Sequence, residues 1–275
     1  MQVNNTFSAG RFGAYFKKHL VDNYRFYLMS IVVLAGLALL MLFVVTIDDN
    51  SYSRYSELIP IYLIGLFFTG SIFTSMSFSE LGNKPHGMDY LLLPASHLEK
   101  FLTTLLITTI GFLLVYHLAF FFAVKAFDVI TNIRKGHHLI NDMVEYNIKD
   151  KEDPWYYYYY PCIVAHAINL LGAVYFHKYS LIKTTFSCIV FGLFLYFLNA
   201  VFTQIIFHDI LNNWNEQFPF VAVNVKVPEG MRWPDHYRQL TQLATMTNLQ
   251  VFILVYLATP VLWTIAYFKL REKEI

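Results

Sequence analysis

The chain has 275 residues, of which 56% are hydrophobic and only 14% are charged, and its formal net charge is +1. Soluble globular domains have about 45–50% apolar and about 25% charged residues, so an ordinary soluble fold is excluded. The surplus apolar surface is expected to face lipid, and a net charge near zero predicts no nucleic-acid partner. We therefore expect an all-α membrane protein with a single transmembrane domain over residues 1–275.

The first predicted element is an amphipathic helix over residues 8–25. Aromatic and apolar residues recur there at helical spacing, and basic residues lie between them. The first set is Phe12, Tyr15, Phe16, Leu20 and Tyr24, and the second is Lys17, Lys18 and Arg25. Such a helix lies on the membrane surface, with a flexible basic tail as the alternative. No cleavable signal is expected, because the first apolar run is long enough to remain in the membrane.

Six apolar runs follow, and each can cross a hydrocarbon core of about 30 Å, which requires on the order of 20 helical residues. None contains Asp, Glu, Lys or Arg, each of which costs about 2.5–3.5 kcal/mol at the bilayer centre. Cys162 and Cys188 lie within these runs and are expected to pack as apolar residues rather than to form a disulfide. We expect spans at residues 26–47, 58–78, 101–124, 157–177, 184–207 and 249–268.

The charge distribution predicts the orientation of these spans. With the N-terminus inside, the inner segments hold eleven of the 20 basic residues but only six of the 19 acidic residues. This bias places both termini in the cytoplasm. Two long loops, residues 125–156 and 208–248, then lie outside, and loops of such length usually have their own structure or a function.

The outer loops contain three recognisable patterns. The run "DPWYYYYYPC" before the fourth span predicts a belt of aromatic side chains at the membrane interface, with a substrate-binding patch as the alternative. In the second loop, "FVAVNVKV" predicts a short strand. The following "PDHYRQLTQLATM" predicts a short helix capped near Asp235.

The chain lacks the common catalytic motifs: no phosphate-binding loop, HExxH zinc pair, GxSxG nucleophile motif or CxxC. We therefore expect no catalytic residue, metal site or cofactor in this chain. Polar side chains within the spans are the candidates for a substrate or proton path, because lipid cannot satisfy them. Interhelical hydrogen bonds are the structural alternative. These candidates are His117, His166, Asn169, Asn199 and Gln204.

Residues 79–100 connect the second and third spans on the cytoplasmic side. Met88, Leu91 and Leu92 share one face of a predicted short helix, which Pro94 ends. Ser96 then caps the third span, with Glu99 completing a capping box. The apolar face is expected to bind lipid headgroups or a groove of another protein, and the scarcity of basic residues favours the protein groove.

This segment resembles the signature of type-2 ATP-binding-cassette exporter permeases, which have an acidic residue, a glycine, a leucine pair, a proline, a serine and a late lysine before the third span. The corresponding residues are Glu80, Gly87, Leu91, Leu92, Pro94, Ser96 and Lys100. The layout of a cytoplasmic lead, six spans and a long outer loop before the last span is also similar. The segments "LLLPASHLEKFL" and "YFHKYSLIKT" further resemble sequences of small permeases of Bacteroidota.

The resemblance implies a multi-pass protein of the bacterial inner membrane that works as a homodimer or heterodimer with separate ATPase subunits. ATP and magnesium would bind to those subunits. Residues 79–100 would couple the permease to the ATPase, and the short "KYSLIK" connection with Lys178 and Lys183 would add a second contact. The expected substrate is a lipid-like, peptide or drug-like amphiphile. A membrane immunity or sensor protein that binds a ligand through its outer loops is the alternative, and an intramembrane enzyme based on His117 or His166 is the third hypothesis.

Overall fold

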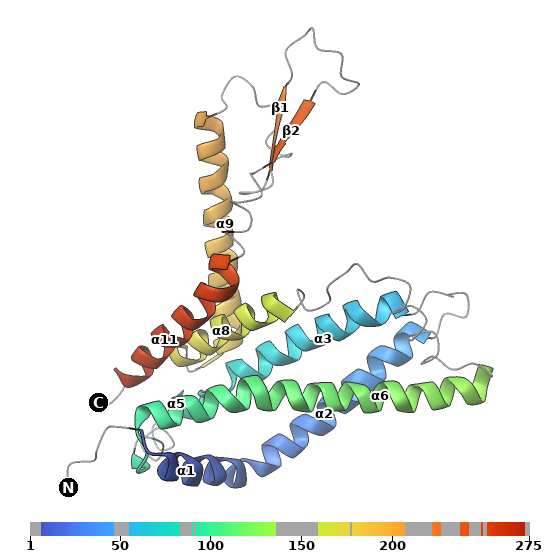
Figure 1. Cartoon of the computed structure of the whole chain (residues 1–275), viewed down its shortest axis with the longest axis vertical. Helices are drawn as coiled ribbons and strands as arrows, with labels where there is room; N and C mark the ends of the chain where they lie inside the picture. Colours follow the sequence, from blue (N-terminus) through green and yellow to red (C-terminus); the bar gives the residue numbers. More distant parts are fainter. Residues whose placement is uncertain are drawn as a thin grey trace. The chain divides into compact units, whose positions relative to one another are not determined.

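The computed structural model of the chain describes residues 7–46, 55–82, 90, 92–135, 159–176, 178–206, 222–226, 237–241, 249 and 252–272 (Figure 1). The chain forms two compact units, and each is described separately below. Unit 1 contains Met1–Leu181 and Pro260–Ile275, and unit 2 contains Ile182–Thr259. The expectation of a single transmembrane domain stays a prediction.

Every predicted span coincides with a helix. The first two are α2 (Tyr24–Thr46) and α3 (Tyr55–Ser75), and the third is a continuous run of α5, the π-helix η2 and α6. The remaining three are α8, α9, and η5 with α11. Their bounds are α5 His97–Leu106, η2 Ile107–Gly111, α6 Phe112–Lys135, α8 Tyr159–Tyr175, α9 Ser180–Ile206, η5 Ile253–Leu257 and α11 Ala258–Arg271.

Three helical segments among the described residues are long and apolar enough to cross a membrane. They are Tyr24–Phe43, His97–Ile130 and Ser180–Ile205. The apolar part of α3, Pro60–Ser75, is shorter. These segments indicate a membrane protein, while the total of six spans and their orientation stay predictions.

The predicted lead helix is α1 (Ala9–Asp22), which is followed by a break at Asn23 and then by α2. The backbone amide and the side-chain Nδ2 of Asn23 both donate to the carbonyl oxygen of His19, so this residue closes the last turn of α1. Residues 24 and 25 of the predicted lead belong to α2. Tyr15 is buried, so α1 packs against the rest of unit 1 with one aromatic side chain.

The third span continues further than the sequence predicts. Residues 125–135 were expected to begin an outer loop, but they are the last turns of α6. The reason is packing against α2, since Phe127 joins Ala38, Leu42 and Ala123 in one buried cluster. Because packing of the apolar face stabilises the helix, α6 continues past its first charged residue, Lys125.

Close approach between α3 and α6 depends on two glycines of α3, Gly65 and Gly70. A Cβ atom at Gly65 would lie 2.5 Å from the hydroxyl oxygen of Tyr116, and one at Gly70 would lie 3.1 Å from the ring of Phe112. The Tyr116 hydroxyl uses this space to donate to the carbonyl oxygen of Tyr62 at 2.7 Å. Small residues therefore let two spans exchange a side-chain hydrogen bond.

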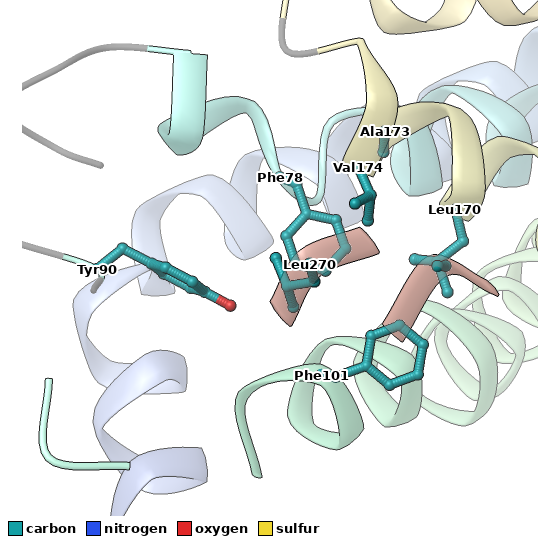
Figure 2. Close-up of a cluster of buried hydrophobic side chains, with 8 residues drawn as sticks. Phe78, Tyr90, Phe101, Leu170, Ala173, Val174 and Leu270 are labelled. Atoms are coloured by element: carbon teal, nitrogen blue, oxygen red, sulfur yellow. The ribbon is translucent and has the colours of Figure 1, made fainter. Parts of the chain in front are cut away.

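A cluster of buried side chains, the Phe78 cluster, unites one end of unit 1 (Figure 2). It joins the chain after α3, the residue Tyr90, the start of α5, the last turns of α8, and α11. Its members are Phe78, Tyr90, Phe101, Leu170, Ala173, Val174, Ala266 and Leu270. The predicted coupling segment, residues 79–100, thus begins and ends against a packed apolar core.

Unit 2 contains most of α9 and a two-stranded antiparallel sheet of β1 (Ala222–Lys226) and β2 (Tyr237–Thr241). The register pairs Ala222 with Thr241 and Lys226 with Tyr237. The strand predicted at "FVAVNVKV" is confirmed, but the short helix predicted at "PDHYRQLTQLATM" is wrong for Tyr237–Thr241. Pairing with β1 supplies backbone hydrogen-bond partners there, and such a tertiary contact overrides local helix propensity.

Candidate functional site

Only part of the predicted coupling face lies within the described residues. Gly87, Met88 and Leu91 fall outside them, so their shared apolar face stays a prediction. Glu80 lies in the short 3₁₀ helix η1 (Ser79–Gly82), of which the backbone is described. The motif residues that can be placed are therefore those from Leu92 onward.

Leu92 and Pro94 are exposed at the far end of the segment. Leu92 is helical and 81% exposed, which is the largest exposure of an apolar side chain in the part of the chain that the structure describes. The backbone bends at residues 93–95, so the break predicted at Pro94 is confirmed. Because Leu92 is already exposed beside the bend, a partner protein can contact it without a change in the backbone of this segment.

The predicted capping box at the start of α5 is confirmed in both directions. The backbone amide of Glu99 donates to Ser96 Oγ at 3.2 Å, and the Ser96 amide donates to Glu99 Oε2 at 2.8 Å. Both residues are buried. Two otherwise unpaired backbone donors are thereby satisfied, which fixes where the third span begins.

Glu99 also holds α1, which the sequence did not reveal. Its Oε1 accepts hydrogen bonds from the Ser8 amide at 2.8 Å and from the Arg11 guanidinium at 3.1 Å. Glu99 is 0% exposed, whereas the Arg11 side chain is 32% exposed. One buried carboxylate therefore connects the lead helix to the first turn of α5.

These contacts determine the protonation state of Glu99. The helical run from His97 to Ile130 contains 34 residues, whereas a bilayer core needs about 20, so its first turn lies outside the span predicted from residue 101. Burial raises the pKa of Glu99, but hydrogen bonds from Ser96, Ser8 and Arg11 outweigh burial and lower that pKa below its ordinary value. Glu99 is therefore charged at neutral pH.

Lys100 anchors the other side of the same junction. Its Nζ donates to the carbonyl oxygen of Tyr90 at 2.7 Å and lies 5.1 Å from the centroid of the Tyr90 ring. Lys100 is only 1% exposed. The lysine of the predicted motif is thus an internal brace that holds the segment's end against α5, rather than a surface contact.

The second predicted contact region is exposed. Lys178 lies in a bend and Lys183 in the first turn of α9, and both side chains are accessible. Tyr179 between them has a φ of 57°, in the left-handed region that few non-glycine residues adopt. Lys178 and Lys183 therefore both lie on the exposed surface of this connection.

His117 belongs to a polar triad with two tyrosines from neighbouring helices. Its Nε2 lies 2.8 Å from the Tyr62 hydroxyl and 3.0 Å from the Tyr159 hydroxyl, and these hydroxyls are 2.9 Å apart. Because Nδ1 lies 2.6 Å from the Leu113 carbonyl oxygen, which only accepts, Nδ1 carries the proton and Nε2 accepts. Tyr159 is one of five consecutive tyrosines, so this member of the predicted interfacial belt points inward.

His166 makes a separate contact with the π-helix. Its Nε2 lies 3.0 Å from Thr108 Oγ1, and that hydroxyl lies 2.8 Å from the Thr104 carbonyl oxygen. The carbonyl takes the hydroxyl proton, so Thr108 Oγ1 must accept from an N–H at His166 Nε2. The other ring nitrogen, Nδ1, is buried and has no hydrogen-bond partner.

The remaining polar candidates are described in their own helices. The side chain of Asn169 donates to the Ala165 carbonyl of its own helix at 2.9 Å, so it shares a helix face but no partner with His166. Asn199 is buried in α9 of unit 2, where its carbonyl accepts from Thr203. Gln204 is half-buried in the same helix.

Cavities in unit 1 are lined in part by residues of the π-helix η2. One, of about 170 Å³, is mostly apolar and lies against α3, α8 and α11. The other, of about 270 Å³, lies beside the junction of α1 and α2 and includes His19 and Asn23 in its lining. Thr108 lines both. Neither the π-helix nor the role of Thr108 has a signal in the sequence, because "ITTIG" is compatible with an ordinary apolar helix.

Comparison with known proteins identifies no relative: no protein-family model, no curated protein and no solved structure matches this chain. Among the residues that the structure describes, no three His, Cys, Asp or Glu side chains are grouped as a metal site would require. Neither cysteine forms a disulfide with another described residue; Cys162 is half-buried and Cys188 is exposed. Function must therefore be argued from the junction at Glu99 and Lys100 and from the cavities.

Proposed function

We propose that the protein is the permease subunit of an ATP-binding-cassette exporter. The observation that carries this proposal is the pair of buried, oppositely charged neighbours at the start of α5. Glu99 holds α1 through Ser8 and Arg11, and Lys100 holds the end of the preceding segment through Tyr90. A segment that receives force from a partner needs such a rigid attachment to the span behind it.

The exposed leucine fits the role of the contact itself. Leu92 stands two residues beyond the brace at Tyr90 and is 81% exposed, while the residues that support it are buried. An apolar side chain on a short helix is what a groove of another protein binds. A push on Leu92 would be transmitted through Tyr90 and Lys100 into the third span, which moves as a rigid element.

The partners follow from this assignment. A separate ATPase subunit would bind ATP and magnesium and receive Leu92 in a groove, with Lys178 and Lys183 making a second contact. Two permease subunits, identical or different, would form the path in the inner membrane for a lipid-like, peptide or drug-like amphiphile. His117 and His166, with their separate polar partners, are candidates for contact with that substrate.

The test is the substitution Leu92→Asp, compared with Ile133→Asp as its control. Ile133 is 79% exposed in the last turns of α6, so both variants place the same charge at an equally exposed apolar position. The tagged protein is first purified from native membranes in mild detergent, and co-purifying proteins are identified by mass spectrometry. We expect a stoichiometric protein with a phosphate-binding loop, lost in Leu92→Asp and kept in Ile133→Asp.

The reconstituted complex then gives a functional readout. Stimulation of ATP hydrolysis by the permease should disappear in Leu92→Asp and persist in Ile133→Asp, with both variants inserted and monodisperse. If the wild-type protein is folded and no ATPase accompanies it, the permease assignment fails. If Leu92→Asp retains full stimulation, the coupling role of this segment is wrong.

One observation favours the second candidate, a membrane protein that binds a ligand through its outer loops. The predicted loop at residues 208–248 contains the paired strands β1 and β2. A loop with its own sheet can present a binding surface, as an immunity or sensor component requires. Full activity in cells that lack any partner ATPase would support this candidate over the permease.

A further inference from the structure

The smaller cavity of unit 1 has the size of a one-ring organic molecule. Its volume is about 170 Å³, and α3, η2, α6, α8 and α11 each contribute to its wall. An enclosed apolar protein cavity of about 150 Å³ holds benzene, so this partly open pocket has room for a molecule of about that size. Among the described residues that line this cavity, none is Asp, Glu, Lys or Arg. A molecule that fits this cavity is therefore small, and the described lining offers no charged side chain to pair with it.

A hydrogen-bond acceptor without a partner is buried directly behind the cavity wall. His166 lines it, and the contact with Thr108 fixes the proton of the imidazole on Nε2. Nδ1 therefore carries a lone pair, and it is buried with no hydrogen-bond partner among the described residues. An unsatisfied buried polar atom destabilises the protein, and a ligand that donates to it recovers that free energy.

A matching donor lies in the same wall. Trp263 on α11 also lines the cavity, and its ring packs edge-to-face against His166 with centroids 6.1 Å apart. Its Nε1–H is likewise buried without a partner. Indole nitrogen only donates, so the two neighbouring rings offer one acceptor and one donor. A hydroxyl group, which donates once and accepts as well, complements both.

We propose that this cavity is a binding site for a small neutral phenol-like molecule, with one aromatic ring and one hydroxyl group. The ring lies among apolar side chains such as Leu66, Phe112 and Leu113. The hydroxyl donates to His166 Nδ1 and accepts from Trp263 Nε1–H. Both nitrogens are covered in the empty molecule, so the half-buried Trp263 side chain shifts to admit the ligand. The site needs no ATPase and is independent of the permease assignment.

The test is titration of the full-length protein in nanodiscs with 4-fluorophenol and with fluorobenzene, followed by fluorine NMR. Empty nanodiscs correct for partition into lipid. We expect saturable binding of both molecules, with roughly tenfold tighter binding of the phenol, as one or two recovered hydrogen bonds would give. Absence of saturable binding, or equal affinity for the two molecules, would overturn the proposal.

Three variants assign the binding to this cavity. Leu113→Phe fills it and should abolish binding of both probes. His166→Phe keeps a ring but removes the acceptor. Fluorobenzene should therefore still bind, and the two probes should bind with about equal affinity. Trp263→Phe, a second route to the same readout, should reduce the preference for the phenol severalfold. An unchanged preference in the folded His166→Phe and Trp263→Phe proteins, or unchanged binding in Leu113→Phe, would refute the site.

Discussion

The substitution Glu99→Gln tests whether the charged junction holds α1 in place. It replaces one carboxylate oxygen by an NH₂ group, removes the negative charge and changes the side-chain volume very little. The carboxylate of Glu99 accepts from three donors, the amides of Ser96 and Ser8 and the guanidinium of Arg11. A glutamine has one oxygen and one NH₂ group, so in either orientation its NH₂ faces at least one of these donors.

The size of the effect follows from burial. Hydrogen bonds to a charged group contribute about 1.5–3 kcal/mol each and neutral ones about 0.5–1.5 kcal/mol, and breaking a fully buried ion pair costs about 3–5 kcal/mol. Arg11 is 32% exposed and can turn to water, which removes part of that cost. We expect Glu99→Gln to weaken the docking of α1 by about 2–3 kcal/mol.

The assay is hydrogen exchange of the α1 amides, Ala9–Asp22, in the purified full-length protein. Weakening by about 2 kcal/mol should speed exchange in α1 by roughly thirtyfold and leave the last turns of α8 unchanged. The control is Glu272→Gln, which removes the exposed partner of Lys269 at 2.6 Å and should have no measurable effect. Equal protection of α1 in wild type and Glu99→Gln would refute the junction's role.

Two further predictions concern pH and helix packing. The lowered pKa of Glu99 means that its contribution to stability is complete above the ordinary pKa of a glutamate and is lost as the pH falls below that value and through the lowered one; the difference in thermal stability between wild type and Glu99→Gln should therefore shrink as the pH falls. Gly65→Ala places a methyl group against the Tyr116 hydroxyl and should destabilise by about 1–3 kcal/mol; Gly36→Ala, where a Cβ meets nothing within 4 Å, should be neutral or slightly stabilising in the same measurement.

The helices and the capping box could be predicted because each depends on neighbouring residues. Runs without charge produce helices wherever water is excluded, and Ser96 with Glu99 needs only the spacing of one helical turn. The end of α6 could not be predicted, since Phe127 stays helical through its packing against α2. The strand at Tyr237–Thr241 likewise depends on β1, which is distant in sequence.

The connections of the candidate site were the least predictable part. Nothing near Glu99 in the sequence indicates Ser8 or Arg11, which lie about 90 residues away and reach it through tertiary folding. Lys100 looks like an interfacial cation in the sequence, yet it is buried against Tyr90. The polar residues within the spans were identified, but their partners were not: His117 meets Tyr62 and Tyr159, and His166 meets Thr108.

The π-helix at Ile107–Gly111 gives the third span one residue more than a regular helix of the same path would hold. Each helical residue turns the chain by about 100°, so this single extra residue sets the face that all later residues of α6 present. Shortening "ITTIG" by one residue would rotate Phe112 and Tyr116 away from the glycines of α3. The length of this span therefore decides how α6 meets α3, whereas an apolar substitution on its lipid-facing side leaves that register unchanged.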